Sequence, residues 1–419
     1  MKYWKIILSV ILFFLIFIGN LLYAKINQYF ITDFEKDVRI VIAVENQALG
    51  EAIIDLWNKT YPQHLGVVDY KIVSDYLDTS TDIIYGRVEE MWLVQENLLS
   101  FTDTYIPYDS IEQYFLEKET GIYFHPLYYD GLVFVYNESI LKELGVSTLD
   151  ADGDGLPEAF DTFEEIFELC TRWEKEKPVY KEKALEYVFP FAFNDFFSFY
   201  PFLTAGDWSL QTQDNLGFNQ YEFYLSLEFI HELGNYNWSF NKNIGQWQYI
   251  DVLVEETAPF SLAADWMIHE YYEEINHSEI RYARFPTYQG IQLRPLVYIY
   301  GYSISADSLY PKAAQALLQL LQGKEGYQLF VDYGEHVSII PKELSSSIII
   351  EKQSIVEWMK AYRYSQVIPY EKVEEESIFS QFQPIVFMET VEKLFRHEIN
   401  VNQAREWFEN WMSINTLEE

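Results

Sequence analysis

The alternation of strand-like and helix-like segments near the start of the chain is the feature that most constrains the fold. Residues 38–44 form an apolar run of strand length, and apolar residues follow at helical spacing over 49–57. Two further short strands are predicted at 67–73 and 82–85. Strands that alternate with helices predict an α/β protein built on mainly parallel sheets.

A chain of 419 residues is too long for one ordinary domain, so we expect two α/β lobes. A Pro-containing bend at 125–130 precedes a strand at 131–136, and a run at 295–304 is typical of a return strand. These crossings predict one lobe from 37–142 plus 296–345 and a second from 143–295 plus 346–419. Helices are expected from about 311, and over 351–364, 378–396 and 401–413.

Charge and cysteine content exclude several classes of function. The formal net charge is −36, from 65 acidic and 29 basic residues. Nucleic-acid binding depends on Lys and Arg contacts to phosphate, so nucleic acid is not an expected partner, and a neutral ligand fits better than an anionic one. Cys170 is the only cysteine, which excludes an intramolecular disulfide, and it lies on the apolar face of a predicted helix. The seven histidines form no cluster with metal-ligand spacing along the sequence.

The N-terminal segment, residues 1–25, has the pattern of an export signal or a membrane anchor. Lys2 and Lys5 precede an apolar run over 6–24 that would span about 28 Å as a helix. Two interpretations stay open: an uncleaved anchor or a cleaved signal peptide. Residues 26–36 are then expected to form a tether. The basic end before the run predicts that the body lies outside, on the extracellular face of the cytoplasmic membrane or secreted.

Several sequence blocks resemble one protein family. They are Asp-Ile-Ile-Tyr at 82–85, Gly-Leu-Val-Phe-Val-Tyr-Asn at 131–137, the aromatic block at 191–201 and the stretch from 259 to 342. Together they resemble the extracellular solute-binding proteins of ABC sugar importers, the maltose/maltodextrin-binding group. The resemblance implies a two-lobed periplasmic-binding-protein fold of type II with hinge crossings. It also implies a monomer without catalytic activity or organic cofactor, which delivers a neutral sugar to an ABC permease.

The resemblance also implies a set of ligand-binding residues in a cleft between the lobes. Sugars present C–H faces that stack on rings and hydroxyl edges that bind carboxylates. The maltodextrin group binds sugar hydroxyls with an Asp-Arg pair after the third strand. In this chain only the Arg has a counterpart, Arg87, so the resemblance does not identify maltodextrin as the specific ligand. The expected ligand-binding residues are Glu45, Asn46, Tyr85, Arg87, Asp130, Asp195, Phe197 and Trp266.

An acidic loop has the spacing of a twelve-residue calcium loop. Such a loop binds calcium through oxygen atoms at positions 1, 3, 5, 7, 9 and 12, with glycine at position 6. Gly155 takes the glycine position, and the shorter Asp161 replaces the usual Glu at position 12. The alternative is an acidic turn that leads to a helix N-cap at Asp161 or Thr162. The candidate metal ligands are Asp150, Asp152, Asp154, Leu156, Glu158 and Asp161.

Two other classes of function stay open at this stage. A surface-anchored, calcium-binding scaffold or adhesin would share the anchor and the acidic loop. A glycoside hydrolase would share the carboxylates and rings, but it needs two carboxyl groups that face each other across the scissile bond. No local motif identifies such a pair.

Overall fold

The computed structural model describes most of the chain beyond the N-terminal segment. The described residues are 38–73, 78–100, 117–118, 121–193, 195–210, 216–236, 248–264, 279–334, 336–367 and 384–415. The predicted anchor or signal, the tether and Trp266 lie outside these ranges. Within them, no helix is both long enough and apolar enough to cross a membrane.

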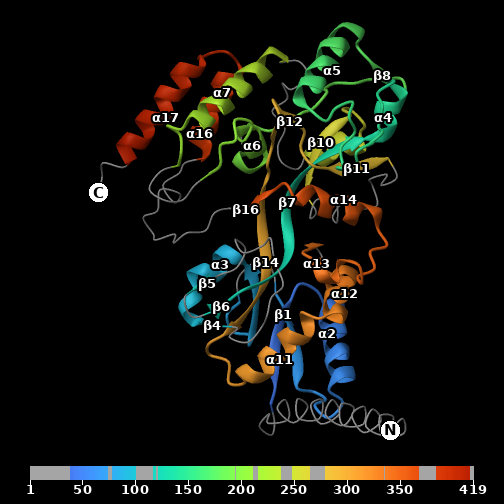
Figure 1. Cartoon of the computed structure of the whole chain (residues 1–419), viewed down its shortest axis with the longest axis vertical. Helices are drawn as coiled ribbons and strands as arrows, with labels where there is room; N and C mark the ends of the chain where they lie inside the picture. Colours follow the sequence, from blue (N-terminus) through green and yellow to red (C-terminus); the bar gives the residue numbers. More distant parts are fainter. Residues whose placement is uncertain are drawn as a thin grey trace, which may run out of the picture.

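A mixed ten-stranded sheet runs through the described structure, which confirms the α/β class (Figure 1). Its main order is β10-β7-β14-β3-β1-β2, with β11 and β15 paired to β7, and β4 and β16 paired to β14. The strands are β1 (Ile40–Val44), β2 (Val68–Ile72), β3 (Ile83–Arg87), β4 (Leu98–Leu99), β7 (His125–Asn137), β10 (Phe260–Ala264), β11 (Ile280–Ala283), β14 (Leu296–Ser305), β15 (Val337–Ser338) and β16 (Gln366–Val367). Three two-stranded sheets pair β5 (Glu117–Lys118) with β6 (Gly121–Ile122), β8 (Val179–Tyr180) with β9 (Lys183–Ala184), and β12 (Thr287–Tyr288) with β13 (Ile291–Gln292).

The expectation of mainly parallel sheets is wrong. β1 is parallel to β2 and β3, but β14 is antiparallel to β3 and β7, and β7 is antiparallel to β10, β11 and β15. A strand's direction depends on the end at which the chain enters the sheet, and the apolar pattern of a buried strand does not encode it.

The expected bend at 125–130 is also wrong, because these residues belong to the long strand β7. Pro126 is accommodated where the register between β7 and β14 shifts, next to Gly301. A proline tends to lie at such irregularities because it lacks the N–H that a regular ladder needs. Gly301 permits the close approach there, since a Cβ at this position would lie 2.1 Å from the carbonyl oxygen of His125.

Helices cover both ends of the sheet. In Figure 1, α2, α11 and α12 lie toward one end of the long strands, and α5, α6, α7, α16 and α17 lie toward the other. The helices expected near 311, 351–364 and 401–413 are confirmed as α11, α14 and α17. The helix expected over 378–396 is confirmed as α16 from Pro384, and residues 378–383 lie outside the described residues. The helices of the described residues are α2 (Gln47–Thr60), α3 (Val88–Leu93), α4 (Glu138–Glu143), α5 (Phe163–Glu176), α6 (Phe196–Leu203), α7 (Tyr221–Leu233), α9 (Gln248–Val254), α11 (Pro311–Leu321), α12 (Lys324–Tyr333), α13 (Lys342–Ser345), α14 (Gln353–Tyr362), α16 (Pro384–Phe395) and α17 (Val401–Asn415).

Side-chain packing forms two clusters of buried hydrophobic residues. The first core includes Ile42, Trp57, Leu317 and Phe330, whereas the larger second core includes Phe163, Cys170, Phe202 and Phe408. Cys170 is therefore a buried residue of α5, as its helical spacing predicts.

The strands β7 and β14 contribute to both cores. β7 supplies Leu127 and Tyr128 to the first core and residues 132–136 to the second. On β14, Tyr300 packs against the first core and Tyr298 against the second. Residues 129–131 and 298–300 thus lie where the two strands pass from one core to the other. The lobe boundaries expected near 142 and 295 stay a prediction.

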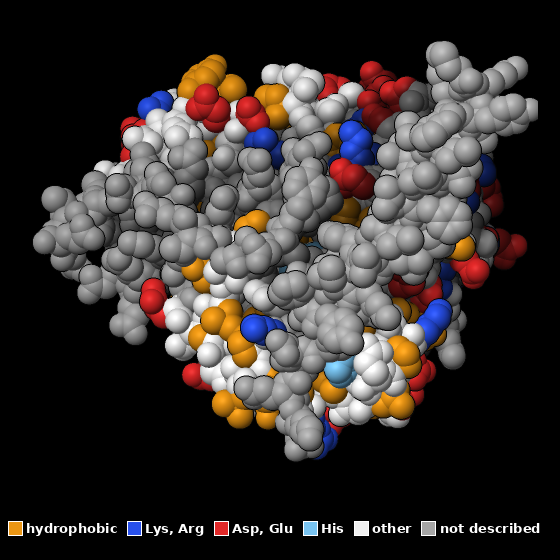
Figure 2. Space-filling model, turned by 60° about the horizontal axis from the view of Figure 1, so that its bottom comes forward, with side chains coloured by type: hydrophobic (Ala, Val, Ile, Leu, Met, Phe, Trp, Pro, Cys, Tyr) orange, Lys and Arg blue, Asp and Glu red, His pale blue; other side chains and the backbone are white. Residues whose placement is uncertain are grey.

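The charged surface agrees with the acidic composition. Figure 2 shows acidic side chains distributed around one face of the molecule, with basic and apolar side chains among them. Arg39 illustrates the arrangement: its side chain is 68% exposed and pairs with Asp69. Single exposed ion pairs of this kind contribute little to stability.

Candidate functional site

One face of the sheet carries a set of rings and charged groups that come from three neighbouring strands. The antiparallel register places Asp130 of β7 opposite Tyr298 of β14, and Arg87 of β3 opposite Tyr300. Because successive side chains alternate between the two faces, Tyr298 and Tyr300 project from the same face of β14. Directly opposite residues share a face, so Asp130 and Arg87 project there as well.

These side chains stack into a continuous aromatic row, which consists of Phe197, Tyr298, Arg87, Tyr300, Tyr85 and His336. The Phe197 ring stacks on Tyr298 at 5.4 Å between centroids and an interplanar angle of 11°. The Arg87 guanidinium lies 4.5 Å from the Tyr298 centroid, and its Nε donates a 2.9 Å hydrogen bond to the Tyr300 hydroxyl. The first contact is a stack of two rings, and the second adds the attraction of a cation to a ring face.

Tyr300 lies between two further rings of the row. Tyr85 stacks on it at 5.6 Å and 19°, and His336 stacks on it at 5.0 Å and 11°. The row therefore extends from α6, which carries Phe197, across β14 to the segment before β15, which carries His336. It connects elements that pack against different cores.

Two largely buried carboxylates, Asp130 and Glu45, accompany the row. Asp130 is 9% exposed, and its charge contributes to raising the pKa of Tyr300, although burial is the larger cause. Burial likewise raises the pKa of Tyr298, with the Arg87 charge acting in the opposite direction. Burial opposes the charge on Arg87, but Tyr300 and Glu89 outweigh it and raise the pKa of Arg87. The row thus holds a guanidinium ion between neutral phenols.

The turn after β1 places Glu45 and Asn46 beside the row. Glu45 accepts a hydrogen bond from the Tyr85 hydroxyl, and its Oε1 atom lies 4.0 Å from Nε2 of His336. Asn46 caps α2 by accepting the N–H of Leu49 at 2.9 Å, and it donates to the carbonyl oxygen of Tyr333. Asn46 therefore has a structural role in holding α2 against the end of α12.

Two of the expected ligand-binding residues are not exposed members of the row, and a third lies outside the described residues. Tyr85 is only 6% exposed and belongs to the first core, from which its ring stacks on Tyr300. Asp195 is the N-cap of α6: it accepts the N–H of Phe197 at 3.1 Å and the hydroxyl of Ser198, and so orients Phe197. Trp266 lies outside the described residues, but β10 ends at Ala264, opposite Leu132 of β7, two residues from Asp130.

Tyr298, Tyr300 and His336 were not predicted from the sequence. The alternation Tyr-Ile-Tyr-Gly-Tyr over 298–302 is a usable signal, because alternate residues of a strand project from one face. The stacking of His336 on Tyr300 leaves no local sequence pattern, since the two residues meet only through the sheet.

The acidic loop brings together the first three candidate metal ligands. One carboxylate oxygen from each of Asp150, Asp152 and Asp154 lies within 4.8 Å of the others. Asp150 accepts the N–H groups of Gly153 at 2.8 Å and of Gly155 at 3.1 Å. These bonds fold the loop into a compact turn whose oxygen atoms suit a hard cation such as calcium.

The remaining candidate metal ligands have other partners. Glu158 accepts the N–H of Ala151 at 2.7 Å, and the N–H of Leu156 is donated to Asp154. Asp161 bonds to the guanidinium of Arg284 instead of joining the three carboxylates. The expected helix N-cap is Thr162, which forms a capping box with Glu165 at the start of α5.

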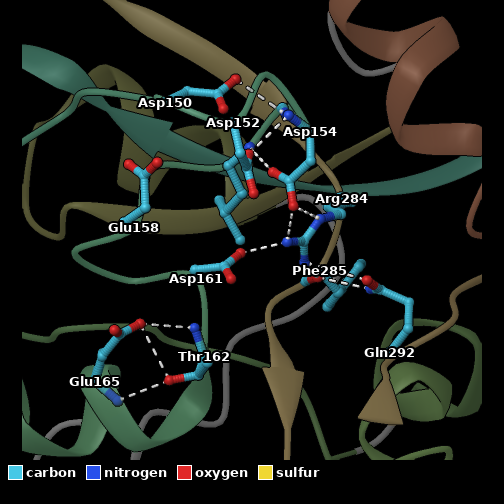
Figure 3. Close-up of polar contacts among 12 residues, drawn as sticks. Asp150, Asp152, Asp154, Glu158, Asp161, Thr162, Glu165, Arg284, Phe285 and Gln292 are labelled. Atoms are coloured by element: carbon cyan, nitrogen blue, oxygen red, sulfur yellow. Dashed lines mark hydrogen bonds and ion pairs between the residues drawn. The ribbon is translucent and has the colours of Figure 1, made fainter. Parts of the chain in front are cut away.

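Arg284 is a buried cation at the base of this loop. Figure 3 shows its guanidinium between the carboxylates of Asp154 and Asp161. Its Nη1 atom also donates to the carbonyl oxygen of Phe285 and to Gln292, both at 3.1 Å. Burial opposes its charge, but the two carboxylates outweigh this and raise the pKa of Arg284. Arg284 thus ties the loop to the segment between β11 and β12.

No family model and no curated protein matches this chain in sequence.

Proposed function

We propose that the chain is the extracytoplasmic substrate-binding component of an ABC transporter, which reversibly binds a neutral carbohydrate and delivers it to a permease. One observation carries the proposal: the aromatic row and Asp130 lie together where β7 and β14 pass from one core to the other. Ligand sites commonly occupy such positions between two packed units.

The chemistry of the row suits a sugar better than an anion. Phe197, Tyr298 and Tyr300 are partly exposed. Phe197 ends the row, so the face that does not contact Tyr298 would stack on a C–H face of the sugar, whereas Tyr298 and Tyr300 would present their ring edges. Asp130 and Glu45 are acceptors for hydroxyl groups, and Arg87 is a donor. A hydrogen bond to a charged group contributes about 1.5–3 kcal/mol, enough to select between sugars that differ in one hydroxyl.

The fold expected for this function is a two-lobed fold of the periplasmic-binding-protein type. The lobes would be 37–142 plus 296–345 and 143–295 plus 346–419, with β7 and β14 in the hinge crossings. Closure of the lobes over the sugar would exclude water and strengthen each polar contact. Opening and closing would make the binding reversible without a chemical step.

The proposed location is the extracellular face of the cytoplasmic membrane, with residues 1–25 as an uncleaved anchor, or the exterior after their removal as a signal. The tether at 26–36 would let the body reach the permease. A monomer is sufficient for this task.

A thermal-shift screen of the full-length protein in detergent, with neutral mono- and oligosaccharides, tests the binding of sugars. A ligand that binds only the native state is expected to raise the melting temperature in a concentration-dependent way. Shifts with peptides or polyols and none with sugars would contradict the proposed class of ligand.

We also propose a structural calcium ion in the acidic loop, held by Asp150, Asp152 and Asp154 with the carbonyl oxygen of Leu156. The clustered carboxylates support this proposal. Glu158 and Asp161 could join the calcium ligands only if they gave up their bonds to Ala151 and Arg284. We therefore expect the affinity for calcium to be weak. Calorimetric titration of calcium is expected to give one weak site in the full-length protein. The absence of heat at millimolar calcium, or an unchanged signal in Asp152→Asn, would contradict it.

A further inference from the structure

Two histidines that are 166 residues apart in sequence meet at the surface of the second core. His231 lies in the last turn of α7, and His397 follows the end of α16. Nδ1 of His397 lies 2.9 Å from Nε2 of His231, and the two rings are nearly perpendicular at 87°. Two imidazole nitrogens therefore lie at hydrogen-bond distance from each other, with their rings nearly perpendicular.

The backbone around the pair holds the two rings in place. His397 has a φ of 57°, a left-handed conformation that costs energy for a residue with a Cβ. Gly234 allows α7 to end directly against this segment, because a Cβ there would lie 2.0 Å from the carbonyl oxygen of Phe395 and 2.8 Å from Nε2 of His397. The convergence of the imidazoles is thus a consequence of two special backbone positions.

The separation of the two nitrogens matches a particular coordination geometry. With metal–nitrogen bonds of about 2.0–2.1 Å, ligands at 90° are about 2.9 Å apart, whereas tetrahedral ligands are about 3.3 Å apart. The observed 2.9 Å equals the first value, and it is also the usual length of the N–H···N hydrogen bond that the pair forms without a metal. Square-planar or tetragonal sites with nitrogen and oxygen ligands are typical of Cu²⁺ and Ni²⁺.

We propose that His231 and His397 form a two-imidazole chelate for a divalent transition-metal ion, with Cu²⁺ the best fit and water completing the coordination. On metal binding, the ring that donates the hydrogen bond moves its proton to its other ring nitrogen, so that both facing nitrogens present a lone pair. Among the described residues, no third His, Cys, Asp or Glu forms a metal-binding group with this pair. The site is distinct from the acidic loop, whose oxygen ligands suit calcium.

The surroundings favour a neutral His231, and the pair is accessible to a metal ion. Burial and the neighbouring His397 lower the pKa of His231, and a metal binds the neutral form of imidazole. His397 is exposed, and the net charge of −36 attracts cations. A bound ion would link α7 to the segment after α16 and stabilise the packing of these C-terminal helices.

Electron paramagnetic resonance of the full-length protein with Cu²⁺ tests the chelate. We expect one Cu²⁺ per chain, a tetragonal spectrum with coupling to two nitrogens, and no displacement by excess calcium, which prefers oxygen ligands. His231→Gln and His397→Gln should each weaken Cu²⁺ binding about tenfold or more and remove one nitrogen coupling.

His64→Gln is the matched control, because His64 lies after α2, on the other core. It should leave the affinity and the spectrum unchanged. A spectrum that keeps both nitrogen couplings in either test variant, or no binding by the wild-type protein at micromolar Cu²⁺, would overturn the proposal. Circular dichroism of each variant shows that it is folded, so a loss of Cu²⁺ is then a property of the site.

Discussion

Replacing Arg284 with methionine is expected to lower the free energy of unfolding by about 3 kcal/mol. The Arg284 side chain is 4% exposed and pairs with Asp154 and Asp161, which are 27% and 30% exposed. Methionine leaves these two carboxylates facing each other without a cation. Breaking a buried ion pair typically costs about 3–5 kcal/mol of stability. We expect the lower end of this range, because both carboxylates retain contact with water. Urea-induced unfolding measures it as a shift of the midpoint at constant slope.

Arg39→Met is the control for this experiment, since it removes the same charge from an exposed pair with Asp69. Its effect is expected to stay within about 0.5 kcal/mol. If Arg284→Met unfolds at the same urea concentration as Arg39→Met, then Arg284 is not the cation that holds the acidic loop.

Replacing Asp130 with asparagine is expected to weaken sugar binding about 10- to 100-fold, which corresponds to about 1.5–3 kcal/mol. Asn has nearly the same shape, but it presents one neutral acceptor where Asp130 presents a charged carboxylate. Asp130 lies opposite Tyr298 and beside the aromatic row, so a sugar stacked on the row would have its hydroxyl edge within reach. Isothermal titration calorimetry with the sugar that gives the largest thermal shift measures the change.

The matched control is Asp207→Asn, which changes a carboxylate that is 63% exposed and bonded to Arg294. It is expected to leave the affinity unchanged. Equal affinities in Asp130→Asn and the wild-type protein would remove Asp130 from the binding site, even if the sugar binds elsewhere.

The local elements could be predicted from the sequence because apolar spacing reports them directly. The strand before Glu45 and the helix around Cys170 lie where their patterns indicate, and the strand expected at 82–85 is β3, which continues to Arg87. Strand direction could not be predicted in this way, because it depends on long-range chain paths. The proline at 126 misled the prediction for 125–130, since a register shift beside Gly301 accommodates it within a strand.

The candidate site could be predicted only in part. Glu45, Arg87 and Asp130 follow from strand ends and the family resemblance, and the structure brings them to the same face or its border. The contacts that complete the site join residues far apart in sequence: Phe197 with Tyr298, and Tyr300 with His336. The contacts of Arg284 and of the His231–His397 pair could not be predicted from the sequence for the same reason, because strand register and helix packing bring these partners together.

The crystal structure of the complex with the sugar that gives the largest thermal shift tests the central claim most directly. We predict a sugar ring that stacks on the face of Phe197 turned away from Tyr298, with a hydroxyl group within hydrogen-bond distance of Asp130. A sugar bound away from the aromatic row, or a structure in which the sugar is absent at saturating concentration, would contradict the proposed binding site.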